Sequence, residues 1–492
     1  MSQINESTIQ TPGVYINEIP SFPPSIAQVA TAIPAFIGYT QIALDGNGNS
    51  LKNIPTMVSS MLEYELYFGT GQLETGIQIN YTQVTNGNVS TDTINFSWYG
   101  AQSRHIMHSS IRNFYANGGG VCYIVSIGPY KANVGDALVL TDFYDVGTGV
   151  GLEAAAKQAD VTLLVFPEGQ NLPSNSVYYA LQGDALAACG ASQDRFCIFD
   201  LYDTGTAIKT SSDLSTAATA YRTDLSTNSP NYGATYFPNL ITVYAYDYDA
   251  TKTKIVHQLN GASGPLNDKM LADINTSSNA AYNTAAYNTL LAALTNQFPV
   301  VLPPSPAMAG VYTSVDGSRG VWKAPANVAL LDVTGTTFQV TDDLQAGLNI
   351  DATSGKSINA IRSFTGKGIL VWGARTLDGN SNDFRYISVR RFYIMVEESV
   401  KLAAMQYVFE PNDGNTWVKV RAMIENYLTN LWRLGALAGS KPEQSFYVSV
   451  GLGQTMTFDD ILNGKMIIEI GMAPVRPAEF IILRFTQIQQ QS

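Results

Sequence analysis

The residues best suited to chemistry are few in this 492-residue chain, and they form no recognisable site. Of its three histidines, His105 and His108 lie three positions apart and could share one face of a helix. Zinc usually takes three or four protein ligands, and no cluster of Cys, Asp or Glu accompanies this pair. We therefore predict that the chain has no metal site.

Two loops imitate ion-binding motifs only in part. Residues 354–357 (SGKS) resemble the end of a phosphate-binding loop, but the upstream glycine of that motif would stand at Ile350. Residues 45–49 resemble the start of a calcium loop, but Ser50 replaces its glycine and Thr56 replaces its closing glutamate. The phosphate-loop motif therefore fails, and residues 45–49 are better interpreted as a polar surface turn.

The motifs of nucleophilic and cofactor-dependent catalysis are also missing. No G-x-S-x-G elbow is present, and the glycines at 118–120 precede a strand instead of joining a strand to a helix. The acidic pairs at 342–343 and 397–398 are adjacent in sequence, so their side chains point in different directions. The sequence therefore predicts no catalytic residue and no cofactor. The alternative is an α/β enzyme with a small molecule bound near 166–175 or 200–206, where strands end.

The elements that would position any site belong to a chain with unusually little charge. Charged residues, 28 Lys+Arg and 40 Asp+Glu, make up 14% of it, against about 25% in a typical soluble protein. The net charge of −12 disfavours general attraction to nucleic acid. Residues 351–492 are nearly neutral, so the negative charge lies before them. Such a surface is covered either by uncharged polar groups or by protein partners, because interface cores are depleted in charge.

The sequence also limits the compartment in which the chain folds. Its first ten residues, MSQINESTIQ, lack the basic segment and apolar core of a signal peptide. Its longest apolar stretches are far shorter than the ~20 residues that span a bilayer. Cys122, Cys189 and Cys197 each lie in or beside an apolar run and are too few for a disulfide framework. We expect buried thiols, folding in the cytoplasm and no membrane insertion.

The middle of the chain has an α/β pattern. Runs rich in β-branched and aromatic residues predict strands at 121–127, 161–166 and 196–200. A helix-like segment at 176–189 separates the second run from the third, which is the order of a parallel crossover unit. A further helix is predicted near 212–225.

The final third has the most regular pattern. From Val389 onward, apolar residues recur every three to four positions and predict an amphipathic helix that ends before Pro411. A second amphipathic helix follows Asn415, and Gly435 or Gly439 could end it.

Beyond these helices we expect strands at 446–450 and 466–470. They flank a single helical turn that Thr457 and Asp460 can cap and Gly464 can close.

Both ends of the chain carry a short apolar strand next to a proline-containing linker. Residues 13–19 precede the segment 21–25 (SFPPS), and residues 480–485 follow Pro474 and Pro477. An isolated strand cannot satisfy its own backbone hydrogen bonds, so each of these strands must join a sheet. Pairing within the chain is one possibility. The terminal positions, the linkers and the low charge favour donation to a neighbouring subunit.

Several segments, in this order along the chain, resemble the sheath protein of contractile tails. This family is shared by contractile bacteriophages, R-type pyocins and extracellular contractile injection particles. The segments are TPGVYINEIP with ATAIPAFIGYT, NGGGVCYIV at 117–125, KAPAN at 323–327, GLNI near 347, the run from Gly368 through VWGARTL to Arg391, FEPN at 409–412 and APVRPAEF at 473–480.

The resemblance implies a multidomain fold of α/β and α+β type. An inner α+β domain would combine N- and C-terminal parts, with a sheet completed by strands from neighbouring subunits, and an outer α/β region would be inserted into it. The implied divisions are an N-terminal arm and linker at 1–25, an inner domain at 26–45 and 355–472, an outer region at 46–354 with two subdomains and an α/β unit at 120–300, and a C-terminal arm at 473–492.

The resemblance also assigns roles to particular residues. Donated strands would include Val14, Tyr15, Ile16, Ile19, Phe480, Ile481, Ile482, Leu483 and Phe485, and the receiving sheet would include Phe446, Val448, Val450, Ile467, Ile468 and Ile470. Hinge linkers would contain Pro20, Pro23, Pro24, Pro474 and Pro477, and candidates for contact with the inner tube are Lys419, Arg421, Glu425 and Arg433.

The implied function is structural. Copies of the subunit would stack as rings in a helical sheath around an inner tube, and contraction from a metastable extended state would drive the tube through a target envelope. Expected partners are further copies, the tube protein, baseplate and tail terminator or cap proteins, and paralogous sheath subunits, with no direct contact to nucleic acid. The particle would be assembled in the bacterial cytoplasm as part of a phage virion or an extracellular contractile particle. Another structural component, such as a tube, capsid or surface-layer protein, is the remaining alternative.

Overall fold

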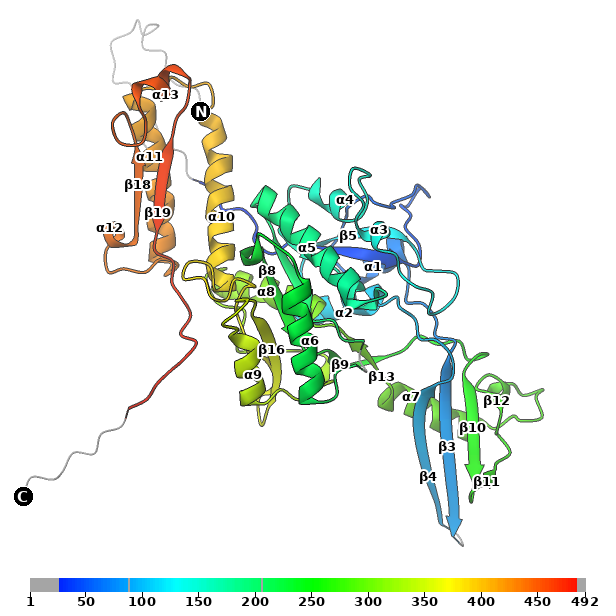
Figure 1. Ribbon diagram of the computed structural model, residues 1–492. Helices are drawn as coiled ribbons and strands as arrows, with labels where there is room; N and C mark the ends of the chain where they lie inside the picture. Colours follow the sequence, from blue (N-terminus) through cyan, green and yellow to red (C-terminus); the bar gives the residue numbers. More distant parts are fainter. Residues whose placement is uncertain (1–25, 87–88, 205–206, 485–492) are drawn as a thin grey trace, which may run out of the picture. The chain divides into compact units, whose positions relative to one another are not determined.

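The computed structural model describes residues 26–86, 89–204 and 207–484 and confirms a mixed, multidomain α/β fold (Figure 1). These residues form two compact units, a smaller one with residues 26–29 and 395–475 and a larger one with residues 30–394 and 476–484. This division differs from the expected one, in which residues 26–45 and 355–394 belonged with the C-terminal part. Strands from both of those segments pair inside the main sheet of the larger unit, which places them there instead.

A nine-stranded sheet forms the centre of the larger unit, in the order β14-β17-β16-β8-β7-β6-β1-β5-β2. Six neighbouring strands, from β16 to β5, run parallel, and antiparallel strands close both edges. The bounds are β1 Pro34–Thr40, β2 Thr56–Val58, β5 Cys122–Pro129, β6 Leu163–Val165, β7 Phe196–Asp200, β8 Gly233–Phe237, β14 Val328–Ala329, β16 Ile358–Phe364 and β17 Gly368–Val371.

The predicted crossover unit is confirmed, with α5 (Asn175–Ser192) between the parallel strands β6 and β7. The predicted helix near 212–225 is α6 (Ser211–Asp224). All seven residues of β1 are buried, as parallel strands covered on both faces require.

Helices cover both faces of this sheet. Thr235 and Tyr236 are successive residues of β8, so their side chains point to opposite faces. The hydroxyl of Thr235 bonds that of Tyr221 on α6, whereas the hydroxyl of Tyr236 bonds that of Tyr312 on α8 (Ser305–Arg319). α6 and α8 therefore lie on opposite faces. The remaining helices of this part are α1 Met61–Phe68, α2 Met107–Ala116, α3 Leu140–Phe143, α4 Leu152–Ala156 and α9 Asp342–Asn349.

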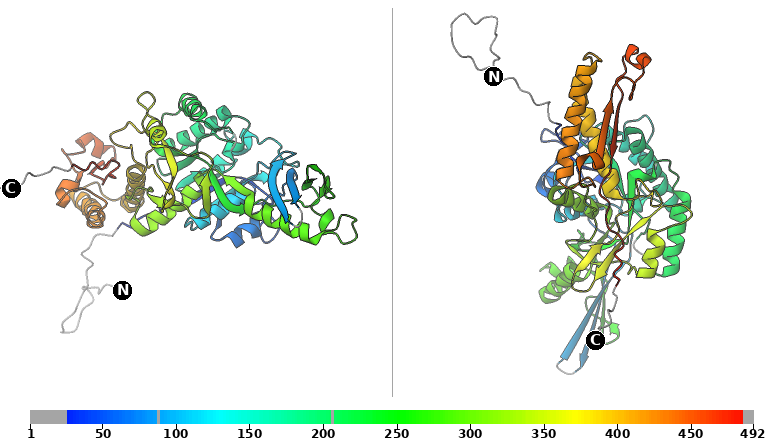
Figure 2. Two further views of the ribbon diagram at one scale, coloured as in Figure 1. Left: turned by 90° about the horizontal axis from the view of Figure 1, so that it is seen from below. Right: turned by 90° about the vertical axis from the view of Figure 1, so that its left-hand side faces the viewer.

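Two further sheets complete the larger unit. In one, the long strands β3 and β4 form a hairpin and β10 lies beside β3 (Figures 1 and 2). The bounds there are β3 Ile77–Asn86, β4 Val89–Trp98, β10 Lys254–Leu259, β11 Ala262–Ser263, β12 Lys269–Met270 and the helix α7 Thr284–Gln297. The other contains β9 Leu240–Ala245, β13 Pro299–Leu302 and β15 Val333–Thr336.

The smaller unit is built from long helices and a short sheet. The division between the units falls inside α10, at Ile394. α10 ends earlier than predicted, at Ala404, and a short 3₁₀ turn follows before Pro411. The bounds are α10 Ile387–Ala404, α11 Gly414–Arg433, α12 Pro442–Ser445, β18 Phe446–Val450, α13 Phe458–Leu462 and β19 Ile468–Met472.

Local sequence signals explain where these elements end. Gly435 follows α11 with a φ of 81°, a left-handed conformation that glycine adopts without strain, so the predicted stop is confirmed. At the start of α13, the side chains of Thr457 and Asp460 each bond the other's backbone N–H, as the sequence predicted. β19 begins two residues later than expected, so Met466 and Ile467 precede it.

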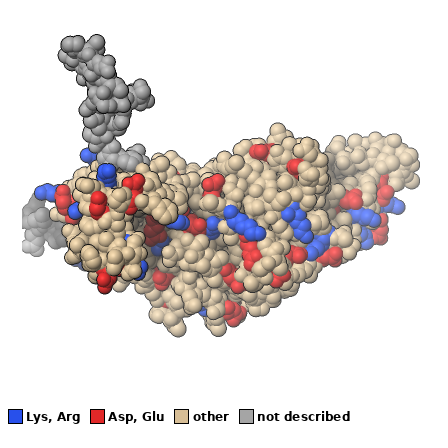
Figure 3. All heavy atoms as spheres, turned by 90° about the horizontal axis from the view of Figure 1, so that it is seen from above, with Lys and Arg blue, Asp and Glu red and all other residues tan. Residues whose placement is uncertain are grey.

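The surface matches the low charge of the sequence. On the face shown in Figure 3, uncharged residues cover most of the area and charged side chains are scattered among them.

Candidate assembly surfaces

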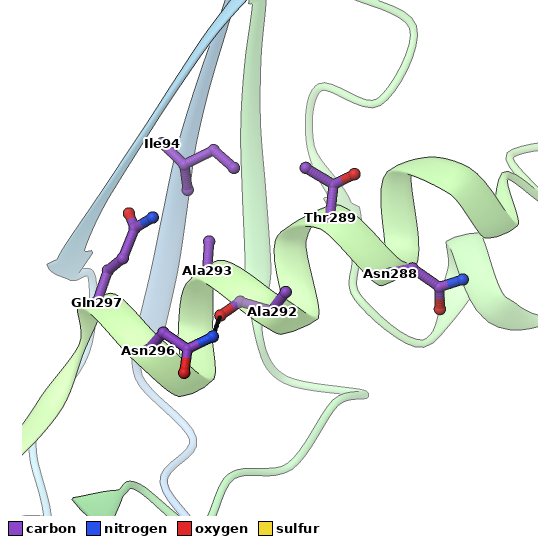
Figure 4. A pocket seen from close by; sticks show the side chains of 7 residues that line it. All are labelled: Ile94, Asn288, Thr289, Ala292, Ala293, Asn296 and Gln297. Carbon is purple, nitrogen blue, oxygen red and sulfur yellow. Dashed lines mark hydrogen bonds between the residues drawn. The ribbon is translucent and has the colours of Figure 1, made fainter. Parts of the chain in front are cut away.

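Two surface grooves of the larger unit are lined mostly by small and polar side chains. One groove lies between α7 and β4, and its apolar lining residues are Ile94, Ala292 and Ala293 (Figure 4). Its polar groups are amides and a hydroxyl, and Asn296 already donates to the carbonyl of Ala292 at 2.8 Å. A second groove along α5 contains Asp184 and Asp224 beside small polar residues.

The two neighbouring histidines do not share a site. His105 precedes α2 and is buried, with Nδ1 3.3 Å from Glu168 Oε1 and Nε2 accepting the Lys131 N–H at 3.0 Å. His108 contacts a different residue, with its Nε2 3.0 Å from Glu65 Oε1. Among the residues that the structure describes, no group of three or more His, Cys, Asp or Glu is arranged to hold a metal ion.

The two loops that imitate binding motifs have structural roles. Lys356 donates through Nζ to the carbonyls of Arg222 and Leu225, at the end of α6. Such contacts complement the helix C-terminus. Asp45 accepts hydrogen bonds from the backbone of Asn47 and Asn49 and from the Asn49 side chain, and these bonds hold the pKa of its carboxyl below the ordinary value. Residues 45–49 thus form a turn, as predicted, and a turn also lies at 352–354.

The cysteines are free thiols with no exposed surface. Cys189 Sγ lies 3.3 Å from Cys197 Sγ, and burial raises the pKa of the Cys197 thiol well above its usual range. Burial likewise raises the pKa of Cys122 to about 12. Thiols held in this protonated form are poor nucleophiles.

Two buried carboxyl groups escaped the sequence analysis. Asp200, at the end of β7, accepts the backbone and hydroxyl hydrogens of Ser305 at the start of α8. Burial raises its pKa to about 7, against the opposing effect of these bonds. Burial also raises the pKa of Glu74 to about 7, although it accepts the Ser103 N–H. No apolar periodicity marks either position, because each depends on a distant partner.

The sheet of the smaller unit has only two strands among the described residues. β18 and β19 pair antiparallel, with Val448 opposite Ile470 and Val450 opposite Ile468. Val448 and Val450 are buried, and β18 packs against α11. Each strand therefore keeps one edge without a strand partner, and such an edge presents unpaired N–H and C=O groups to another chain.

The C-terminal segment is apolar and exposed. Phe480, Ile481, Ile482 and Leu483 have between 67% and 78% of their surface accessible, and the segment pairs with no described strand. Single exposed apolar residues are common, but four in a row are typical of an interaction site. Phe485 and the N-terminal candidates Val14, Tyr15, Ile16 and Ile19 lie outside the described residues, as do Pro20, Pro23 and Pro24.

The C-terminal linker is shorter than expected. Ala473 donates its N–H to Ser445 and accepts from Ala438, each at 2.8 Å, and Val475 donates to Ala436 at 3.1 Å. Pro474 forms an isolated antiparallel β-bridge with Leu437 in the same region. Residues 476–478, with Pro477, are therefore the part of the predicted hinge that lies beyond these bonds.

The four candidates for tube contact all lie on α11. Lys419, Arg421 and Arg433 are exposed, while Glu425 is half-buried. Arg421 Nε donates to Glu425 Oε1 at 2.8 Å, one helical turn away. An exposed pair of this kind adds little stability, so these charges are available to a partner.

Comparisons with known proteins agree with this picture of exposed assembly surfaces. The family described as the phage tail sheath C-terminal domain matches residues 380–488. The tail sheath protein of Vibrio phage KVP40 is 25% identical over 185 residues, and that of Burkholderia phage BcepMu is 28% identical over 144 residues. These matches cover 37% and 28% of this chain, and the chain spans only 26% and 30% of those relatives' length.

Two solved structures match along almost the whole chain. One is the sheath complex of PVC, an extracellular contractile injection system, in its contracted state, with 30% identity over 98% of both chains and a TM-score of 0.62. The other is the contracted helical sheath of the anti-feeding prophage, with 31% identity over 98% of this chain and 100% of that one and a TM-score of 0.59.

The fold is that of a structural sheath subunit. The chain belongs to the family of contractile sheath proteins. Within the residues described here, every helix is too short or too polar to cross a bilayer.

Proposed function

We propose that this chain polymerises helically with further copies of itself around an inner tube and contracts to drive that tube through a target envelope. The observation that carries the proposal is the likeness to two contracted sheaths over 98% of the chain. The other expected partners are baseplate and tail terminator or cap proteins and paralogous sheath subunits. The particle would be assembled in the bacterial cytoplasm and would act as part of a phage virion or an extracellular contractile particle.

We infer that neighbouring copies are joined by donated strands. The segment 480–485 of one copy, and 14–19 of another, would extend the β18–β19 sheet of a third. Each added strand would form about five backbone hydrogen bonds, of roughly 0.5–1.5 kcal/mol each before ordering costs. Fully burying each Phe, Ile or Leu would add about 1.5–3 kcal/mol. The exposed side chains at 480–483 are the source of this second contribution.

The energy for contraction would be conformational. An extended sheath held in a metastable state releases free energy when its subunits form better contacts, so this mechanism uses no nucleotide, cofactor or catalytic residue. During contraction nearly rigid bodies would move while the linkers at 21–25 and 476–478 bend and the donated strands keep the copies joined. The charges on α11 at Lys419, Arg421, Glu425 and Arg433 would face the tube.

Deletion of residues 1–20 tests strand donation directly. Because no described core residue is removed, we expect a folded, soluble body with an unchanged circular dichroism spectrum that no longer forms long sheaths in electron micrographs. A deletion of residues 480–492 should have the same effect, since it removes the other donated strand. Normal helical sheaths from both truncated chains would refute the proposal.

A further inference from the structure

The C-terminal segment is fixed at one residue just before its exposed apolar run. Arg375 grips the carboxylate of Glu479 through two nitrogens, Nε at 2.9 Å from Oε1 and Nη2 at 2.7 Å from Oε2. Asn349 Nδ2 donates to Oε1 at 2.7 Å, and the Tyr386 hydroxyl donates to Oε2 at 3.1 Å. All four residues belong to the larger unit.

These three donors form a preorganised receptor for a carboxylate. Asn349 is the last residue of α9, Tyr386 immediately precedes α10, and Arg375 lies between β17 and α10. The side chain of Arg375 is only 4% exposed, and its backbone N–H and C=O both bond the Asn359 side chain. A planar guanidinium fixed in this way matches a carboxylate with two parallel bonds.

Removing Glu479 from the receptor would be costly. It would leave a nearly buried guanidinium without this anion, and an uncompensated buried charge is strongly destabilising.

The same contacts also change the pKa of Glu479 itself. Burial raises the pKa of its carboxyl, but the bonds from Arg375 and Asn349 outweigh burial and hold that pKa below the ordinary value. The carboxylate therefore remains ionised, and the contact remains formed, under neutral conditions.

The contrast with the adjacent residues is sharp. Glu479 has a side chain that is 20% exposed, whereas Phe480 is 67% exposed and Ile482 78%. On the other side, Val475 is bonded to Ala436 in the smaller unit, and residues 476–478 connect it to Glu479. The apolar run thus begins at a defined place instead of at the end of a long free chain.

We propose that Arg375, Asn349 and Tyr386 form a latch that holds Glu479 and thereby presents residues 480–484 as a ready strand to a second copy of this chain. The identity of the acceptor rests on the proposed function, whereas the latch itself is a property of the single chain. Fixing one end of a short strand in advance lowers the conformational entropy that its capture must overcome. Glu479 is in this sense a positioning residue for the donated strand.

Limited chymotrypsin digestion of the unassembled chain tests the latch without any assembly. The bond after Phe480 can enter the protease only when Glu479 leaves its receptor. Glu479→Ala should therefore speed cleavage there by about tenfold or more, because even one charge-assisted bond is worth that factor. The matched control is Asp342→Asn, which breaks another ion pair of the larger unit, Asp342–Arg362, and leaves Glu479 and its three donors unchanged.

A double-mutant cycle separates the latch from a loss of folding. Arg375→Ala alone and Arg375→Ala with Glu479→Ala should show the fast cleavage of Glu479→Ala, since each removes the same contact. Circular dichroism melting of each variant would show that the rest of the chain stays folded. Wild-type cleavage rates in Glu479→Ala, or fully additive effects in the double variant, would overturn the latch.

Assembly then tests the role of the latch. At equal concentration, Glu479→Ala should yield several-fold less sheath than Asp342→Asn in electron micrographs. Fast cleavage with undiminished assembly would contradict the presentation of the strand while leaving the sheath function intact. Failure of the unmutated chain to assemble would instead contradict the proposed function, and the protease result would still decide the latch.

Discussion

The main sheet of the larger unit and the β18–β19 sheet of the smaller unit differ in how far their strands are covered and paired within the chain. The nine-stranded sheet has helices on both faces, and its strand β1 is buried along its whole length. The two-stranded sheet leaves both outer edges without a strand partner among the described residues, and the apolar run at 480–483 is exposed. One region is complete in a single chain, and we propose that the other is completed by association. Substitutions in the two regions should therefore affect different measurements.

The largest effect should come from the complete sheet. Phe36 in β1 is fully buried and packs edge-on against Phe114, with 5.0 Å between the ring centroids. Phe36→Ala should lower the free energy of unfolding by about 3–5 kcal/mol because it leaves a cavity in a close-packed core. Denaturant unfolding of the unassembled chain measures it. A loss below ~1 kcal/mol would show that this region is less tightly packed than the structure indicates.

The next effect depends on pH. The pKa of Asp200 is raised from 3.8 to about 7 by burial, so the folded state binds its proton more tightly than the unfolded state. The stabilisation that this tighter proton binding gives the folded state is complete below pH ~4. It is lost as the pH rises through about 7, and the loss in the free energy of unfolding is up to about 4 kcal/mol. The Asp200→Asn variant has no carboxyl group at this position, so it lacks this pH-dependent contribution.

The stability of this variant relative to wild type should therefore increase between pH 4 and pH 7. Denaturant unfolding at a series of pH values measures the difference. A difference that does not change with pH would contradict the raised pKa.

A smaller effect is expected beside the open sheet. Thr457→Ala removes the side-chain cap that bonds the Asp460 N–H at the start of α13. Loss of a cap costs about 1 kcal/mol. Hydrogen exchange at that amide, followed by mass spectrometry, should accelerate roughly fivefold, while amides of β1 serve as the internal control and should not change.

Elements with local signals could be predicted from the sequence, whereas pairings between distant segments could not. The β6–α5–β7 crossover, the buried face of α11 and the cap at Thr457 follow from periodicity and capping patterns within a few residues. The position of β1 does not, because residues 34–40 pair with strands about 90 and 130 positions away. The start of β19 was shifted by two residues because the run MIIEI is apolar enough to fit several registers.

The candidate site shows the same limit. The apolar character of residues 480–483 was visible in the sequence. The segment pairs with no strand among the described residues, which agrees with donation without testing it. The receptor of Glu479 was not visible, because Asn349, Arg375 and Tyr386 lie about 90 to 130 positions earlier in the chain. A glutamate between a proline-containing linker and an apolar run is the one sequence signal that could have indicated it.

The smallest effect on folding should come from the exposed run itself. Ile482→Ala should change the unfolding free energy of the single chain by less than ~0.5 kcal/mol, since that side chain is 78% exposed. The same change should reduce sheath formation, which sedimentation of assembled particles would measure. For Phe36→Ala, by contrast, the large effect is expected on the unfolding free energy of the single chain. If Ile482→Ala destabilised the single chain by several kcal/mol, the segment would have a partner within its own chain.

The most direct measurement is an electron cryo-microscopy map of the sheath assembled from the unmutated chain. We predict that residues 480–485 of one copy run beside the β18–β19 sheet of another copy, as an added strand with backbone hydrogen bonds, while Glu479 remains on Arg375. A map in which these residues pair within their own chain, or in which the β18–β19 sheet receives no strand from another copy, would contradict the account.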